Sequence, residues 1–185
     1  MRMFVAVRPP EPVIDDLDRY VEPRRESDST LRWSRPEHWH VTLAFLPDVA
    51  ERDLDELTER LADTGTAGAP FSLGLAGTGA FPNPAKAKVL WLGLTGQVDE
   101  LAHLAGNVRS AAGRAGTQVE GGPYRPHLTL ARIGQPLDVT RWLRIFQTYE
   151  SPTWTADELV LYRSHLGHGP SRYEPVATLP LGATP

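Results

Sequence analysis

Two short and nearly identical stretches organise the sequence: His-Val-Thr-Leu at residues 40–43 and His-Leu-Thr-Leu at residues 127–130. Each stands in an apolar run typical of a β-strand, WHVTLAFL (39–46) and HLTLARI (127–133). Residues i and i+2 of a strand share a face, so each stretch presents a histidine and a threonine on one side and buries the alternate residues on the other. Two such copies arise by chance in roughly one sequence in several hundred. We therefore interpret the pair as one functional constellation rather than two unrelated strand histidines.

The residue types in this pair favour chemistry at phosphorus. Two imidazoles with pKa values near about 6.5 allow a neutral base and a protonated acid to coexist at neutral pH. One of His40 and His127 can take a proton from an attacking oxygen while the other gives one to the leaving oxygen. The hydroxyls of Thr42 and Thr129 can donate to the non-bridging phosphate oxygens, where charge builds up in the transition state. The two motifs are nearly equivalent, so the residues alone leave open which histidine is the acid.

The rest of the chain alternates short apolar runs with helical patterns. The spacing of apolar residues predicts helices over about 11–21, after an Asp48–Glu51 capping box, over 98–112 and over 139–146. Further strands are predicted at 3–7, 71–77, 86–94, 154–166 and 172–181. Short strands interrupted by helices and joined by hairpin-like connections predict an α+β fold with antiparallel sheets.

Composition excludes several classes of protein. The 185 residues favour one domain with at most two small lobes. A net charge of −4 does not suit a protein that sheathes a nucleic-acid backbone, and we expect recognition of a terminus instead. Residues 1–68 carry more acidic than basic side chains and residues 69–185 the reverse, so an anion site is expected to draw on the second part. The absence of cysteine excludes disulfides, thiolate metal sites and a thiol nucleophile.

Targeting and nucleotide-loop signals are also missing from the sequence. The first apolar run is too short for a signal peptide, and no stretch approaches the roughly 18–20 apolar residues that span a bilayer, so a cytoplasmic location is expected. Neither G-x-G-x-x-G nor G-x-x-x-x-G-K-[ST] occurs. His38 and His40 form an H-x-H that could suggest a metal, but no acidic cluster accompanies them. We therefore expect no metal and no cofactor.

The paired H-x-T-L motifs resemble those of the two-histidine phosphoesterase superfamily. Within it, the chain is most similar to the bacterial RNA 2′,3′-cyclic phosphodiesterase branch, historically called 2′-5′ RNA ligase. The supporting matches are RMFVAV (2–7), WHVTLAFL (39–46), GTGAFP (77–82) followed by VLWLGL (89–94), YRPHLTLAR (124–132) and ELVLYRSHLGHGPSRYEPVATLPL (158–181). One departure is Pro47, where the family commonly has glycine; we expect it to alter the strand exit rather than the chemistry.

The resemblance implies a bilobal, pseudo-twofold fold of two antiparallel β-sheets with flanking helices and an active-site cleft between the lobes. Residues 1–185 would form a single domain whose two lobes of similar design each carry one H-x-T motif. The implied reaction is metal-independent hydrolysis of RNA 2′,3′-cyclic phosphate ends to 2′-phosphomonoesters. His40 would be the proton donor to the leaving 3′-oxygen and His127 the proton acceptor that activates water. No protein partner is implied, and the chain is expected to be a monomer.

Three further residues are candidates for substrate binding. Arg132, five residues after His127, matches an arginine of the family motif and could hold a phosphate or stack on a base. Strict alternation puts it on the face opposite His127, so it must lie at a strand end or a bulge to reach the site. Phe45 could stack a nucleobase or belong to the core. Tyr124 could lie at the rim of the site or on a loop surface.

Two other functions remain open at this stage. ATP-independent 2′-5′ RNA ligation follows the same reaction path in reverse, with a 5′-hydroxyl as the nucleophile in place of water. A non-catalytic binder of RNA ends or cyclic nucleotides is the third reading, but binding alone would need neither an acid nor a base. A bell-shaped pH–rate profile would separate the enzymes from the binder.

Overall fold

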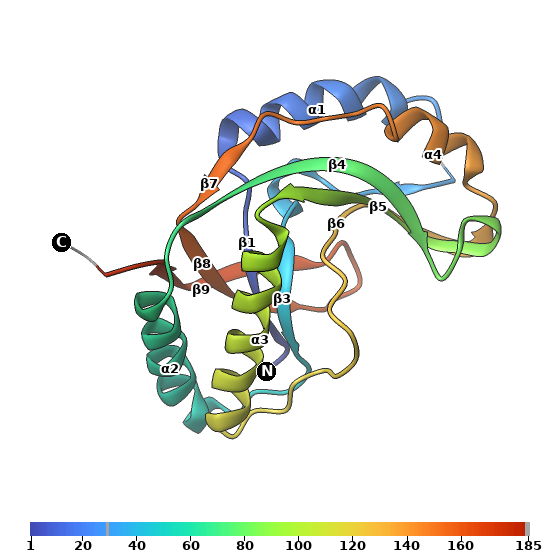
Figure 1. Ribbon diagram of the computed structural model, residues 1–185. Helices are drawn as coiled ribbons and strands as arrows, with labels where there is room; N and C mark the ends of the chain where they lie inside the picture. Colours follow the sequence, from blue (N-terminus) through green and yellow to red (C-terminus); the bar gives the residue numbers. More distant parts are fainter. Residues whose placement is uncertain (29, 184–185) are drawn as a thin grey trace.

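The strands form one antiparallel arrangement in the computed structural model, which describes residues 1–28 and 30–183 (Figure 1). Their spatial order is β7-β4-β5-β6-β3-β1-β8-β9, and β2 pairs with β6 beside this path. The strands are β1 (Met3–Val7), β2 (Arg32–Trp33), β3 (Val41–Leu46), β4 (Phe71–Phe81), β5 (Ala87–Gly96), β6 (Leu128–Leu137), β7 (Trp154–Ala156), β8 (Glu158–His165) and β9 (Arg172–Pro180).

Four α-helices cover the sheet in two pairs. They are α1 (Glu11–Arg25), α2 (Leu54–Ala67), α3 (Val98–Arg114) and α4 (Thr140–Phe146). In Figure 1, α1 and α4 lie along the outer side of the arch that β4 and β5 form. Helices α2 and α3 lie side by side and pack against the other half of the strands, with α3 on β3 and α2 on β8 and β9. The predicted α+β class with antiparallel strands is confirmed.

Over the described residues, the strands of the two halves pair with each other at a single position. Strands β7, β4, β5 and β6 form one half, strands β3, β1, β8 and β9 the other, and Val41 of β3 pairs with Leu128 of β6 between them. The family resemblance implies two antiparallel sheets, and this pair links them into one path. Both residues are fully buried, so the junction is part of the core.

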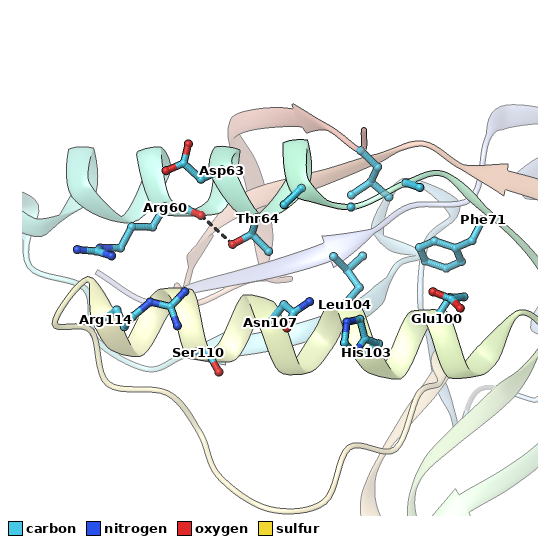
Figure 2. Close-up of a pocket in the computed structure, with 14 residues that line it drawn as sticks. Arg60, Asp63, Thr64, Phe71, Glu100, His103, Leu104, Asn107, Ser110 and Arg114 are labelled. Atoms are coloured by element: carbon cyan, nitrogen blue, oxygen red, sulfur yellow. Dashed lines mark hydrogen bonds between the residues drawn. The ribbon is translucent and has the colours of Figure 1, made fainter. Parts of the chain in front are cut away.

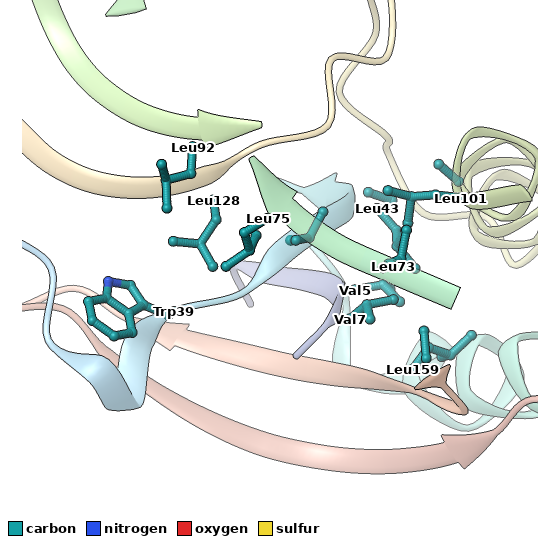
Figure 3. Packing of buried hydrophobic residues seen from close by; sticks show 14 of the residues in the cluster. Val5, Val7, Trp39, Leu43, Leu73, Leu75, Leu92, Leu101, Leu128 and Leu159 are labelled. Carbon is teal, nitrogen blue, oxygen red and sulfur yellow. The ribbon is translucent and has the colours of Figure 1, made fainter. Parts of the chain in front are cut away.

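One apolar core runs through both halves (Figure 3). Strand β1 is buried at every position because it lies between β3 and β8, which explains its uninterrupted apolar sequence. Trp39, which precedes β3, is 1% exposed and fills the core near the junction, with Leu128 and Leu75 in the same view (Figure 3). Burying this aromatic side chain contributes a large apolar area at the point where the two halves meet.

Two local expectations are wrong. Helix α1 continues past residue 21 to Arg25, with Pro23 inside it. Its last turn is held by side chains, because the Arg25 guanidinium donates to Asp18 Oδ1 at 2.7 Å. Asp48 caps no helix; it accepts a hydrogen bond from the N-terminal ammonium group at 2.9 Å, and α2 begins only at Leu54.

Candidate active site

The junction between the halves brings the two motifs together. Val41 and Leu128 are the middle residues of the two H-x-T sequences, and they face each other in an antiparallel pair. In this register the histidine of each motif stands opposite the threonine of the other. The neighbours of a buried pair point to the opposite face of the sheet, so all four polar side chains share the face away from the core.

The four side chains line one cavity of about 610 Å³. His40 and His127 occupy one diagonal of the four-residue group, and Thr42 and Thr129 occupy the other. An anion placed between them meets an imidazole on two sides and a hydroxyl on the other two. The sequence predicts that these residues act together, and the structure brings them together.

Each imidazole is oriented by the same local contact. His40 Nδ1 lies 2.6 Å from the carbonyl oxygen of His38, and His127 Nδ1 lies 2.8 Å from the carbonyl oxygen of Arg125. A carbonyl oxygen can only accept, so Nδ1 carries the hydrogen in both rings. Nε2 is therefore the nitrogen that accepts or donates a proton in the cavity. The two-residue spacing of this contact is identical in the two motifs.

Aromatic rings surround both imidazoles, in different geometries. The His40 ring stacks on Phe4, with centroids 4.7 Å apart and planes at 28°, and meets the edge of Tyr173 at 5.5 Å. The His127 ring instead stands perpendicular to Phe81, with centroids 5.0 Å apart and planes at 87°. These walls hold the rings in place and exclude water from one side of each.

The surroundings favour the neutral form of both histidines. The pKa of His40 is lowered to about 4, mainly by burial and also by the positive charge of Arg132, while the bond to the His38 carbonyl acts in the opposite direction. Burial also lowers the pKa of His127, and Arg132 acts in the same direction. A bound phosphate carries the opposite charge to Arg132, so it raises the pKa values of both histidines. One of the two imidazoles can then be protonated and act as the acid.

The lowered pKa of His40 predicts a loss of stability in acid. The unfolded chain takes up a proton on this side chain near pH 6.5, whereas the folded chain does so only near pH 4, so unfolding is favoured as the pH falls between these values. Between pH 7.5 and 5.0 this group removes about 2 kcal/mol from the free energy of unfolding. His40→Gln should lose less stability than the wild type over this interval in urea unfolding. His103→Gln, on the exposed face of α3, should behave as the wild type, and equal losses in all three proteins would contradict the assignment.

A β-bulge follows each motif and turns the next side chains into the site. The pairing of β3 with β1 shifts register so that Leu43 is the extra residue, and the pairing of β6 with β5 shifts so that Leu130 is the extra residue. One extra residue reverses the alternation of faces beyond it. Arg132 and Phe45, each five residues after its histidine, therefore return to the face of the site. The bulge that the sequence requires for Arg132 is present.

The two bulges place different side chains at the two ends of the site. Arg132 lines the cavity of the histidines. Phe45 lines an adjoining cavity of about 340 Å³, which shares Thr42 and His127 with the first and includes Tyr124. The Tyr124 hydroxyl donates to the carbonyl oxygen of Thr42 at 2.9 Å, and burial raises its pKa, so it is a neutral phenol. Phe45 and Tyr124 thus line the adjoining cavity together with Arg109 and Arg125, and Arg132 lines the cavity of the histidines.

Several residues of the site escape sequence reasoning. Arg32, Arg35 and His38 line the cavity from the segment before β3, and Tyr173 lines it from β9. The pairing of β2 with β6 brings Arg32 there, and a strand of two residues gives too short a pattern to predict. The signal for His38 is only its position two residues before His40.

A slightly larger cavity, of about 650 Å³, lies between α2 and α3 (Figure 2). Its charged side chains are of both signs, among them Asp63 on α2 and Glu100 and Arg114 on α3. The Thr64 hydroxyl donates to the carbonyl oxygen of Arg60 at 2.8 Å, within its own helix (Figure 2). Among the described residues that line this groove, His103 is the one imidazole, so the groove lacks the pair of imidazoles that the histidine cavity provides. We therefore take the histidine cavity as the candidate active site.

Within residues 1–28 and 30–183, no group of three His, Cys, Asp or Glu side chains is arranged to hold a metal ion. Over the same ranges, no helix is long and apolar enough to cross a bilayer.

Comparison with known proteins finds relatives over most of the chain. Residues 9–168 match the family model of the 2′-5′ RNA ligase superfamily. An RNA 2′,3′-cyclic phosphodiesterase of Escherichia coli (strain K12) is 31% identical over 181 residues, which are 95% of this chain and 93% of that protein. One from Geobacillus stearothermophilus is 31% identical over 98% of this chain, which spans only 58% of that relative's length.

A solved structure agrees with the fold over nearly the whole chain. The crystal structure of E. coli LigT complexed with 3′-AMP superimposes with a TM-score of 0.76 at 25% identity and covers 97% of each chain. The family match covers most of the sequence, including both H-x-T motifs. The chain belongs to the 2′-5′ RNA ligase superfamily.

Proposed function

We propose that this chain hydrolyses the 2′,3′-cyclic phosphate at an RNA end and leaves a 2′-phosphomonoester. The observation that carries the proposal is the pair of imidazoles, each held through Nδ1 by a backbone carbonyl, that face one cavity together with two threonines. The relatives named RNA 2′,3′-cyclic phosphodiesterase and the LigT complex with 3′-AMP support the same substrate class.

The reaction needs one proton transfer at each imidazole. Nε2 of His127 takes a proton from water while the water oxygen forms a bond to phosphorus. The bond from phosphorus to the 3′-oxygen breaks on the far side, and Nε2–H of His40 gives that oxygen a proton. His127 gains one proton and His40 loses one, so the two imidazoles exchange protonation states. Proton exchange with solvent then returns both to their starting states. The family resemblance supports this assignment of acid and base.

The threonines and Arg132 act on the charge of the phosphate. Thr42 and Thr129 flank the position between the imidazoles, where their hydroxyls can donate to the non-bridging oxygens. Arg132 supplies a fixed positive charge at the cavity. Arg132 lowers the pKa values of the two histidines, and the negative charge of a bound phosphate raises them. Substrate binding therefore favours protonation of the imidazole that acts as the acid.

The test uses an oligoribonucleotide that ends in a 2′,3′-cyclic phosphate, incubated with the protein in EDTA. A phosphatase specific for 3′-phosphates then locates the product phosphate. A terminal phosphate that resists this enzyme is the expected 2′-phosphomonoester. Persistence of the cyclic end would count against the proposal, and a sensitive 3′-phosphate would reverse its regiochemistry.

Arg132→Gln should change both binding and titration. Loss of a charge-assisted contact to phosphate is expected to raise KM by about tenfold. Removal of a nearby positive charge favours the imidazolium, so the pKa values of His40 and His127 should both rise. Steady-state kinetics and NMR titration of the imidazole protons measure the two effects. Arg52→Gln, an exposed arginine before α2, is the matched control and should change neither; unshifted histidines in Arg132→Gln would refute the electrostatic coupling.

The same proposal extends to the organisation of the protein. We expect a single domain of two lobes, one motif in each, that acts on RNA ends as a monomer in the cytoplasm. Sedimentation of the purified protein tests the monomer, and a stable dimer would exclude it.

A further inference from the structure

The histidine cavity holds more positive charge than one phosphate needs. Arg32 of β2 lies directly opposite Arg132 of β6 in an antiparallel pair. Facing residues of such a pair point to the same side of the sheet, and both arginines line the cavity. Like charges directly opposite each other destabilise a strand pair, so the fold gains nothing from this arrangement.

No carboxylate compensates this charge inside the cavity. Its lining includes Arg32, Arg35 and Arg132 and, over the described residues, neither aspartate nor glutamate. In that same part of the chain, Arg32 and Arg132 form no ion pair, and Arg35 has only a loose contact of 3.8 Å with the exposed Glu37. The whole chain carries a net charge of −4, so the positive charge gathered in the cavity is opposite in sign to the net charge of the protein. The side chains that line the cavity therefore carry a net positive charge.

The added charge lies beside the reacting group rather than on it. Arg132 on β6 acts on the reacting phosphate, whereas β2, which carries Arg32, lies one strand spacing, about 5 Å, farther to the side. A second anion one ribose away from the cyclic phosphate would meet this end of the cavity. The phosphate on the 5′-oxygen of the same terminal nucleoside is such an anion.

We propose that Arg32 and Arg35 form a second phosphate subsite, which binds the 5′-phosphate of the nucleotide that carries the cyclic end. The inference rests on the proposed function and names its substrate class: 5′-phosphorylated or internally linked terminal nucleotides, in preference to a free nucleoside 2′,3′-cyclic phosphate. The planar guanidinium suits two-point contact with phosphate oxygens, and two arginines can hold it without a metal.

The experiment compares adenosine 2′,3′-cyclic phosphate with its 5′-phosphorylated form. In the wild type, kcat/KM should be at least about tenfold higher for the 5′-phosphorylated compound, with an advantage that shrinks as salt rises. In Arg32→Gln and in the double variant with Arg35→Gln, this ratio should fall toward one. Arg52→Gln removes an equal charge outside the cavity and should keep the wild-type ratio.

Binding affinities of nucleotides that are not turned over test the same subsite independently of catalysis. Calorimetry should show that adenosine 2′,5′-bisphosphate binds the wild type at least about tenfold more tightly than adenosine 2′-phosphate, and that Arg32→Gln abolishes the difference. Equal kinetics and equal binding of the two members of each pair in the wild type would overturn the subsite while ring opening stands. An advantage that survives in the double variant would also overturn it. Failure to open any cyclic phosphate would refute the proposed function, and calorimetry would then decide the subsite by itself.

Discussion

His127→Ala and His40→Ala should each lower kcat for opening of the cyclic phosphate by about 10²- to 10⁴-fold, the usual contribution of a positioned acid or base. The two imidazoles act on one phosphate, so the double variant should be little slower than either single variant. Single-turnover assays at neutral pH measure this without interference from product release. His103→Ala, an exposed histidine of α3, is the matched control and should keep wild-type activity.

A substrate with sulfur in place of the 3′-oxygen separates the two roles. A thiolate leaves without a proton far more readily than an alkoxide, because a thiol is much the stronger acid. If His40 is the acid, this substrate should restore most of the rate to His40→Ala and little to His127→Ala. Restoration in His127→Ala instead would exchange the two assignments.

Leu128→Ala should lower the free energy of unfolding by about 2–5 kcal/mol, the range for truncating a buried leucine. Leu128 is fully buried and forms, with Val41, the single pair that joins the two halves of the sheet. The substitution leaves a cavity beneath the motif, so kcat should fall as well. Urea unfolding followed by tryptophan fluorescence measures the stability, and the enzyme assay measures the rate.

Leu166→Ala makes the same chemical change at a side chain that is 69% exposed. It should alter the free energy of unfolding by no more than about 0.5 kcal/mol. Similar losses in the two variants would mean that the junction contributes no more to stability than the surface does.

The sequence predicts the candidate site well where local periodicity decides the outcome. The alternation around His40 and His127 predicts that each shares a face with its threonine and that the leucines are buried. The apolar spacing likewise predicts the helices, because an amphipathic face is a local property. The register between the two motifs cannot be predicted from local periodicity, because it depends on a pairing between residues 87 positions apart.

Two features of the site depend on tertiary structure and cannot be predicted from the periodicity of the sequence. The charge distribution predicts an anion site built from the second part of the chain, yet Arg32 and Arg35 come from the first. Arg32 reaches the cavity through the pairing of β2 with β6, and Arg35 lines it from the segment after β2. The contacts of Nδ1 with backbone carbonyls require the path of the chain before each strand. By contrast, the bulge before Arg132 is foreseeable, because a functional arginine at that spacing needs one.

The position of β1 in the sheet has a consequence for the order of events during synthesis. The partner of β1, β8, is made more than 150 residues after β1. Until then, one edge of a wholly apolar strand lacks its partner, and an exposed apolar edge can pair with another chain. The half of the site that His40 occupies therefore matures only after β8 has been made. Nascent chains that stall before residue 158 should be prone to aggregation and should depend on chaperones for their solubility.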